Sequence, residues 1–340
     1  MQRSRLLVPA LAAVGGLSLT GCAAFSDDSE AAADSRTVAV GLYPLEYVAA
    51  RVAGDAFDVQ NLTTPGGEPH DLTLDVKETA TIADSALLVY VDSLQPAVDE
   101  AAEEVATGQV LDAADVVDLL PFAEEEGHDH AEEEGHEGET AEEHAEHADE
   151  EGHAEEEGHV HGEEEHDHGE YDPHFWQDPL RMAELGDAIA GRLGEIDPDQ
   201  KDTFAANAAD LRTDLEELDA SYADGLAQCT ITTVVTNHDA FGYLEKYGLH
   251  LESITGITPD AEPTPAALAD LQELIKSDGI TTVFSESLVS PKSAETLASD
   301  VGVQTEVLDT LEGLTDDTAD EDYLSLMRQN LTKLEQANRC

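Results

Sequence analysis

The chain has 340 residues, of which 77 are acidic and 15 are Lys or Arg, so its formal net charge is -62. This balance excludes nucleic acid as a partner, because binding to nucleic acid needs basic side chains that neutralise phosphates. It favours cations as ligands, and the length is sufficient for two domains of ordinary size.

Residues 1–22 have the pattern of a secretory signal. Two arginines precede an apolar run that is shorter than the ~20 residues of a transmembrane helix. The sequence Leu-Thr-Gly-Cys that ends at Cys22 resembles a bacterial lipobox, in which the cysteine is lipidated. We therefore expect a lipid anchor at Cys22 and a flexible tether over residues 23–36; ordinary signal cleavage just after the cysteine is the alternative.

From residue 37 onward, short β-branched runs alternate with segments of helical periodicity. In the first half, the runs predict strands at residues 37–40, 59–62, 86–90 and 116–119. In the second half, they predict strands at residues 232–236, 249–254, 281–284 and 304–308, and helices at 265–276 and 291–301. This alternation predicts an α/β fold of two lobes, each with a parallel sheet covered by helices.

One long helix is expected to join the lobes. Asp197 and Pro198 form a good helix start, and the pattern continues to residue 228. Its apolar stripe consists of Phe204, Ala208, Leu211, Leu215, Leu218, Tyr222 and Leu226. A helix over 197–228 has a length on the order of 40 Å and does not hinge easily, so we expect lobes 37–196 and 229–340 at a nearly fixed angle.

A low-complexity tract of Glu, Asp, Gly and His interrupts the first lobe at residues 123–170. Its composition cannot form a buried core and predicts disorder. Ten histidines lie in it: His128, His130, His136, His144, His147, His153, His159, His161, His166 and His168. Histidines beside carboxylates bind metals such as zinc, so we expect an auxiliary site of low affinity; a solvated acidic spacer is the alternative.

Two cysteines remain if Cys22 carries lipid. Cys229 and Cys340 form an even pair in an oxidising compartment, for which a disulfide is the default interpretation. Two unrelated thiols are the alternative, because proximity cannot be read from a sequence.

The four histidines outside the tract are His70, His174, His238 and His250. His70 follows the second predicted strand, His174 lies in the segment Asp-Pro-His-Phe-Trp, and His238 follows the first strand of the second lobe. Asp309 follows the last strand. Since ligands of open α/β sheets bind beyond the carboxyl ends of strands, these four groups can converge, whereas His250 is expected to be a hydrogen-bonding group.

These motifs, their order, the histidine-rich tract and the long helix resemble the solute-binding proteins of zinc and manganese ABC importers. The resemblance covers residues 37–340 and implies that His70, His174 and His238 bind the metal between the lobes. It makes Asp309 the matching fourth ligand, with Glu68 or water as alternatives. Glu286 is expected to support the site from outside or to cap the next segment.

Three imidazoles and one carboxylate suit tetrahedral Zn²⁺, whereas manganese prefers more oxygen ligands. The manganese importers that this site resembles place a carboxylate at the third motif, where this chain has His238. The resemblance therefore implies a monomeric, extracytoplasmic lipoprotein that captures Zn²⁺ and delivers it to an ABC permease. A manganese-binding homologue is the alternative.

Two other function classes remain open. A zinc enzyme also uses three histidines, but the chain has no His-Glu-x-x-His or Gly-x-Ser-x-Gly motif, so we expect no enzyme. A metal-storage or adhesion lipoprotein would depend on the histidine-rich tract, and deleting residues 124–170 separates that function from transport.

Overall fold

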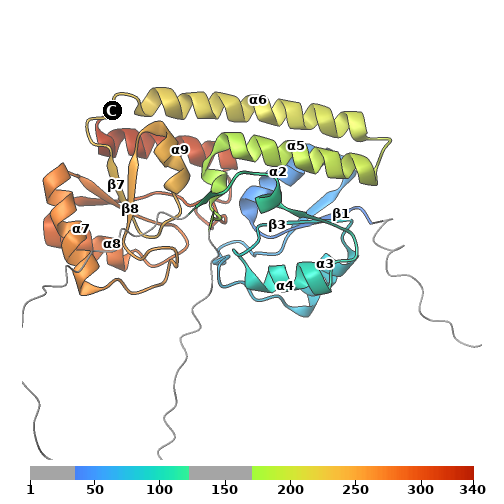
Figure 1. Cartoon of the computed structure of the whole chain (residues 1–340), viewed down its shortest axis with the longest axis horizontal. Helices are drawn as coiled ribbons and strands as arrows, with labels where there is room; N and C mark the ends of the chain where they lie inside the picture. The colour runs from blue at the N-terminus through green and yellow to red at the C-terminus, as the bar shows by residue number, and fades with distance from the viewer. Residues whose placement is uncertain (1–34, 122–170) are drawn as a thin grey trace, which may run out of the picture.

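The computed structural model describes residues 35–121 and 171–340, which form two α/β lobes side by side beneath a layer of long helices (Figure 1). The predicted signal with Cys22, nearly all of the predicted tether and the histidine-rich tract lie outside the described residues. Within the described residues, no helix combines the length and apolar character needed to cross a bilayer.

The first lobe has a four-stranded parallel sheet with the order β2-β1-β3-β4. Its strands are β1 (Thr37–Val40), β2 (Asp58–Asn61), β3 (Leu87–Tyr90) and β4 (Gln109–Asp112). Its helices are α2 (Tyr43–Ala53), α3 (Val76–Asp84) and α4 (Pro96–Glu104). The start of α3 is fixed by a capping box, in which the Asp75 side chain accepts from the backbone N–H of Glu78 and the Glu78 side chain accepts from that of Asp75.

The second lobe repeats this design. Its parallel sheet has the order β10-β9-β7-β8. The strands are β7 (Thr233–Thr236), β8 (His250–Ser253), β9 (Thr282–Ser285) and β10 (Gln304–Val307). The helices α7 (Pro265–Asp278) and α8 (Lys292–Val301) cover one face, and each ends at a glycine with a left-handed backbone, Gly279 and Gly302. The α/β prediction of two lobes with parallel sheets is confirmed.

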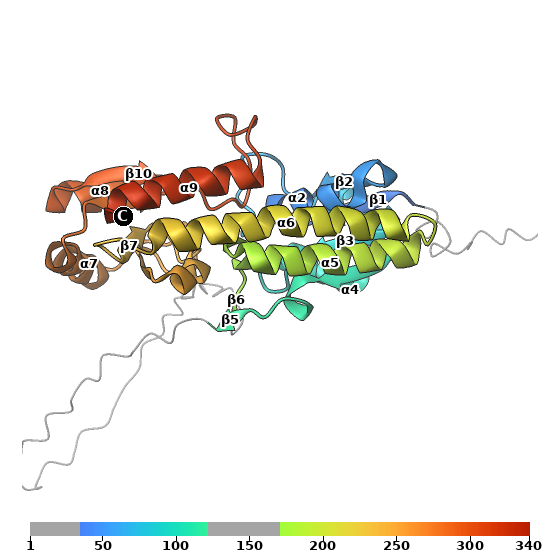
Figure 2. The same ribbon diagram turned by 90° about the horizontal axis from the view of Figure 1, so that it is seen from above.

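Three helices form the layer above the lobes. They are α5 (Pro179–Ile196), α6 (Lys201–Leu226) and α9 (Tyr323–Asn338). Figure 2 shows α6 running along both lobes, with α5 beside it over the first and α9 beside it over the second. A short antiparallel pair, β5 (Leu120–Pro121) and β6 (Tyr171–Asp172), lies near the lobe boundary.

Two predicted elements differ in the structure. Residues 116–119 are not a strand: β4 lies earlier, and Asp112 caps a 3₁₀ turn at Ala113–Asp115 that ends it. The long helix begins at Lys201 rather than at Asp197. Asp197 instead ends α5, with φ −126° and ψ 84°, because the residue before a proline is disfavoured in the helical region.

The hydrophobic core is continuous across both lobes. One cluster joins Val38 of β1, Leu215 of α6, Phe284 of β9 and Tyr323 of α9, and all four side chains are fully buried or nearly so. Separate clusters fill the outer layers beneath α3 and α4 and beneath α7 and α8. Domains move freely when their interface is small and polar, so this shared core favours a fixed angle between the lobes.

A disulfide joins Cys229 and Cys340, which lie 111 residues apart, so this prediction is confirmed. It ties the segment after α6 to the end of α9. Backbone hydrogen bonds from Thr230 and Ile231 to the carbonyl of Asn338 reinforce the same junction. The disulfide and these hydrogen bonds therefore hold the end of α9 against the segment that leads into β7.

Candidate metal centre

His70 lies on the turn-rich segment that follows β2, and a buried amide positions that segment. The Nε2 of Gln95 lies within hydrogen-bond distance of the carbonyls of Gly41 and Pro69 and of the Thr63 hydroxyl. A side chain at position 41 would place its Cβ 2.4 Å from Gln95 Oε1, so any residue other than glycine there would displace this amide. The carbonyl next to His70 is therefore tied to the ends of β1 and β2.

His174 lies between β6 and a 3₁₀ turn, Phe175–Gln177, and its imidazole is fully buried. The Asp172 carboxylate lies 2.7 Å from its Nδ1 and accepts its backbone N–H at 2.9 Å. A buried carboxylate at Nδ1 favours the tautomer that leaves Nε2 with a lone pair. The ring is therefore fixed with Nε2 as the available donor.

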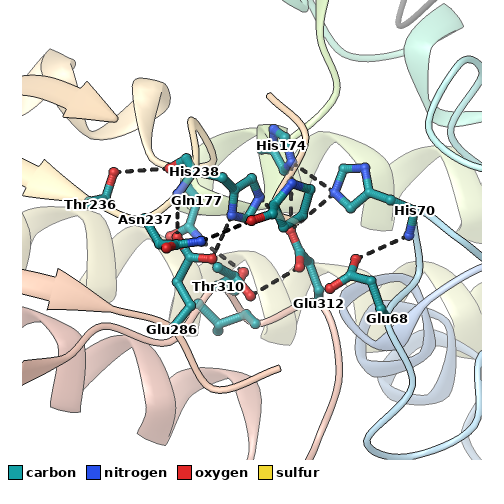
Figure 3. Close-up of polar contacts among 12 residues, drawn as sticks. Glu68, His70, His174, Gln177, Thr236, Asn237, His238, Glu286, Thr310 and Glu312 are labelled. Atoms are coloured by element: carbon teal, nitrogen blue, oxygen red, sulfur yellow. Dashed lines mark hydrogen bonds and ion pairs between the residues drawn. The ribbon is translucent and has the colours of Figure 1, made fainter. Parts of the chain in front are cut away.

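His238 follows β7 and is held in the same way by Glu286, which follows β9. One carboxylate oxygen of Glu286 lies 2.6 Å from Nδ1, and the other accepts the backbone N–H of His238 at 2.8 Å. Both side chains are almost completely buried. Glu286, predicted as an outer support, lies against the face of His238 that points away from the other histidines (Figure 3).

Glu312 lies on the loop after β10, and this loop is tightly constrained. Asn330 of α9 accepts from the backbone N–H of Asp309 and donates to its carbonyl. The Asp309 side chain accepts the N–H of Leu311, whose φ of 63° is in the left-handed region that disfavours a branched apolar residue. This turn directs the buried Glu312 side chain toward the histidines.

The Nε2 atoms of the three histidines and Oε1 of Glu312 converge on one point. Oε1 lies 3.6 Å from His70, 3.5 Å from His174 and 3.4 Å from His238, and the His70 and His174 nitrogens are 3.4 Å apart. All four donor atoms lie within 4.8 Å of one another. A tetrahedral zinc site with bonds of about 2.0–2.2 Å has edges of about 3.3–3.6 Å. Four of the six separations between the donor atoms therefore have the length that a tetrahedral ion requires.

Two of these donor atoms are buried without a hydrogen-bond partner in the described residues, namely His238 Nε2 and Glu312 Oε1. Buried polar atoms are normally paired, because an unpaired one costs free energy. A cation between them satisfies both lone pairs, so the four groups could hold a metal ion.

The charges at the site are strongly coupled. Burial lowers the pKa of His238, but the Glu286 and Glu312 carboxylates outweigh it and raise this pKa well above its ordinary value. For Glu312, burial raises the pKa, but the nearby His238 and His70 imidazoles outweigh it and hold this pKa well below the usual range. Burial and the charge of Glu312 raise the pKa of Glu68 to about 7.

The structure brings some of the predicted site residues together and leaves others apart. His70, His174 and His238 come together, whereas Asp309 lies outside the group, its carboxylate occupied by Leu311 N–H and the Ser287 hydroxyl. The histidine predicted to lie apart, His250, is exposed over 69% of its side chain.

Two carboxylates complete this comparison. Glu68 accepts the backbone N–H of His70 and is absent from the convergent set. Glu312 was missed by the sequence analysis. One signal in the sequence could have found it. Glu312 lies three residues after Asp309 on the loop that follows the same strand, so both carboxylates lie near the same edge of the sheet.

The chain is similar to proteins whose names describe zinc uptake or zinc binding. Residues 38–337 match the family described as zinc-uptake complex component A, periplasmic. The zinc-binding lipoprotein AdcA of Streptococcus pneumoniae R6 is 34% identical over 344 residues, covering 99% of this chain and 61% of AdcA. The high-affinity zinc uptake system protein ZnuA of Bacillus subtilis 168 is 33% identical over 330 residues, covering 95% of this chain and 92% of ZnuA.

A solved structure agrees with these relatives. The Zn(II)-bound ZnuA-like domain of S. pneumoniae AdcA superposes with a TM-score of 0.67 at 31% identity, covering 90% of this chain and 100% of that domain. The chain thus spans about three fifths of the length of AdcA, 61%, and most of the length of B. subtilis ZnuA.

Proposed function

Because the chain belongs to the zinc-uptake complex component A family, we propose that it captures Zn²⁺ outside the cytoplasm and delivers it to the permease of an ABC importer. The ligands in this proposal are His70, His174, His238 and Glu312, so Glu312 replaces Asp309 as the fourth ligand. Zn²⁺ is the transported cargo. The observation that carries the proposal is the convergence of three Nε2 atoms and one carboxylate oxygen within 4.8 Å of one another, with four of their six separations at the edge length of a tetrahedral zinc site.

Zinc is favoured over manganese by the donor set. Three imidazoles suit a borderline ion with four ligands, whereas manganese prefers more oxygen donors in an octahedral arrangement. The four donors also account for a closed tetrahedral site, whereas a catalytic zinc keeps a position open for water. We therefore propose binding and transfer without a chemical step.

Cell-surface attachment is a further part of the proposal. Relatives are described as lipoproteins or periplasmic proteins, and the sequence that ends at Cys22 matches the pattern of a lipid anchor. We propose that the mature chain is a monomer anchored through Cys22, with lobes over residues 37–196 and 229–340 and an auxiliary metal-binding tract at 123–170. A storage or adhesion role gains no specific observation from the described residues.

The test is a zinc competition titration on the full chain with chelators that hold free zinc low, so that weak sites stay empty. His238→Ala is expected to lose the tight site, because it removes one of four donors and leaves one buried oxygen of Glu286 without its imidazole partner. His250→Ala is the matched control, since its exposed side chain lies in the same lobe. Equal zinc affinity in the two variants would contradict the proposal.

A further inference from the structure

The two oxygens of the buried Glu312 carboxylate have different surroundings. Oε1 lies 3.4–3.6 Å from the three imidazole nitrogens and has no hydrogen-bond partner in the described residues. Oε2 accepts a hydrogen bond of 3.1 Å from the Thr310 hydroxyl. One oxygen is therefore directed to the shared centre, and the other is engaged away from it.

We propose that Thr310 is a specificity-determining residue, which holds Glu312 to a single coordinating oxygen and so disfavours ions that need more than four donors. This inference rests on the proposed zinc-binding function. A hydrogen bond to an ionised, buried oxygen is among the stronger ones in proteins, and water cannot replace it at a side chain that is 1% exposed. Rotation of the carboxylate to a two-oxygen contact would break it.

The backbone that carries the Thr310 hydroxyl is fixed, which limits how far the hydroxyl can follow such a rotation. Its carbonyl accepts hydrogen bonds from Trp176 Nε1 at 2.8 Å and Gln177 Nε2 at 2.9 Å. Both donors come from the segment directly after His174, so the His174 ring and the Glu312 loop are held against each other (Figure 3). Thr310 itself is 1% exposed.

On the other side, the turn at Leu311 is closed by its N–H bond to Asp309, and Asn330 clamps the backbone of Asp309. The loop therefore presents the hydroxyl and the carboxylate in a defined relation. Backbone contacts hold the loop in place, and the Thr310 hydroxyl contacts the Glu312 carboxylate. A substitution that removes only the hydroxyl therefore tests this contact and keeps the contacts that hold the loop.

Ions differ in how they respond to this restriction. Zn²⁺ is satisfied by three nitrogens and one oxygen in a tetrahedron, so a one-oxygen Glu312 completes its coordination. Mn²⁺ prefers about six donors rich in oxygen, and the second oxygen of Glu312 is one additional donor that this site could offer. Engagement of Oε2 by Thr310 therefore penalises Mn²⁺ selectively.

The experiment compares Thr310→Val, which removes the hydroxyl and keeps the shape, with Thr310→Ser, which keeps the hydroxyl. Zn²⁺ and Mn²⁺ affinities are measured on the full chain in chelator buffers. The reporter is the emission of Trp176, the sole tryptophan of the sequence, whose ring centroid lies 5.2 Å from that of His174. Thr310→Val is expected to reduce the ratio of zinc to manganese affinity by about tenfold or more. Thr310→Ser is expected to keep the ratio of the unaltered chain.

X-ray absorption of the zinc-loaded and manganese-loaded chains supplies a second readout, which needs no stable variant. In the unaltered chain, zinc is expected to have four ligands with one oxygen from Glu312; two Glu312 oxygens on zinc would overturn the inference. An unchanged affinity ratio in Thr310→Val would also overturn it. Failure of the proposed function gives a different result, namely retention of tight zinc binding in His238→Ala.

Discussion

Replacing Glu286 with Gln tests how far the outer carboxylates determine metal affinity. Glu286 accepts both the Nδ1–H and the backbone N–H of His238, and its side chain is 2% exposed, so water does not screen the pair. Gln has one acceptor oxygen, and its NH₂ group must face one of the two donors. Loss of such a partner typically weakens metal binding by about 10- to 100-fold, and we expect that range for Zn²⁺.

The pH dependence of this loss has a defined sign. At the proposed site, Zn²⁺ competes with a proton at His238. Burial lowers the pKa of His238, but Glu286 and Glu312 raise it well above its ordinary value. Affinity in the unaltered chain should therefore fall as the pH falls, starting above ~6.5. Without the Glu286 charge the pKa of His238 is lower, so proton competition begins at a lower pH. The difference between variant and parent should then be largest at alkaline pH and smaller at acidic pH.

The assay is chelator competition from pH 6 to pH 9, followed by Trp176 emission. Glu245→Gln is the matched control, since it removes one negative charge from an exposed position of the same lobe. An affinity loss of equal size at every pH, or a loss that grows as the pH falls, would refute the reasoning. Equal effects of the two variants would show that net charge, rather than contact with His238, is responsible.

Three further outcomes are expected. Leu215→Ala, at a fully buried position of α6, should lower the free energy of unfolding by about 2–5 kcal/mol in urea, whereas the exposed Glu217→Ala should change it little. Cys340→Ser should lower the free energy of unfolding by about 2–5 kcal/mol, because it removes the disulfide. In calorimetry, a reductant should lower the unfolding temperature of the parent chain and leave that of the variant unchanged. The metal-free chain should lose stability as the pH rises. Because the pKa of His238 is raised by folding, its protonation stabilises the folded chain fully below pH ~6.5. This contribution is lost as the pH rises through the folded-state pKa, and urea unfolding at several pH values measures the loss.

The helices and strands could be predicted from the sequence because the spacing of their apolar residues reflects which side chains are buried. The predicted stripe of the long helix, from Phe204 to Leu226, is the set of α6 residues that the structure buries. The strand at residues 37–40 agrees residue for residue with β1. The errors occurred where a local effect competes with pattern: Val116 and Val117 look like a strand, but they follow a capped turn, and Val117 packs in the core from a loop.

The three histidines of the site could be placed in advance because each follows an element that ends at the lobe boundary. The fourth group could not. Asp309 and Glu312 both follow β10, and the choice between them depends on the left-handed turn at Leu311, which the sequence does not signal because leucine rarely adopts it. That turn engages Asp309 with its own loop and directs Glu312 inward. Backbone strain at this position is consistent with a functional constraint, since strained residues persist where the surrounding structure determines them.

A site on a fixed scaffold has to admit and release its ion by local movement. The continuous core and the disulfide restrain the lobes, and buried partners hold His174, His238 and Glu312, whose side chains are at most 1% exposed. His70 is 5% exposed and lies on a turn-rich segment between β2 and α3.

His70 is therefore the most exposed of the four grouped side chains. Its segment is linked to the opposite lobe by a hydrogen bond from the Gly66 N–H to the Leu314 carbonyl, close to Glu312 in the chain. This contact and the hydrogen bond from Gln95 to the Pro69 carbonyl both hold the segment that carries His70. Preorganised donors lower the ordering cost of binding, so the buried partners of His174, His238 and Glu312 favour a tight site in the proposed function.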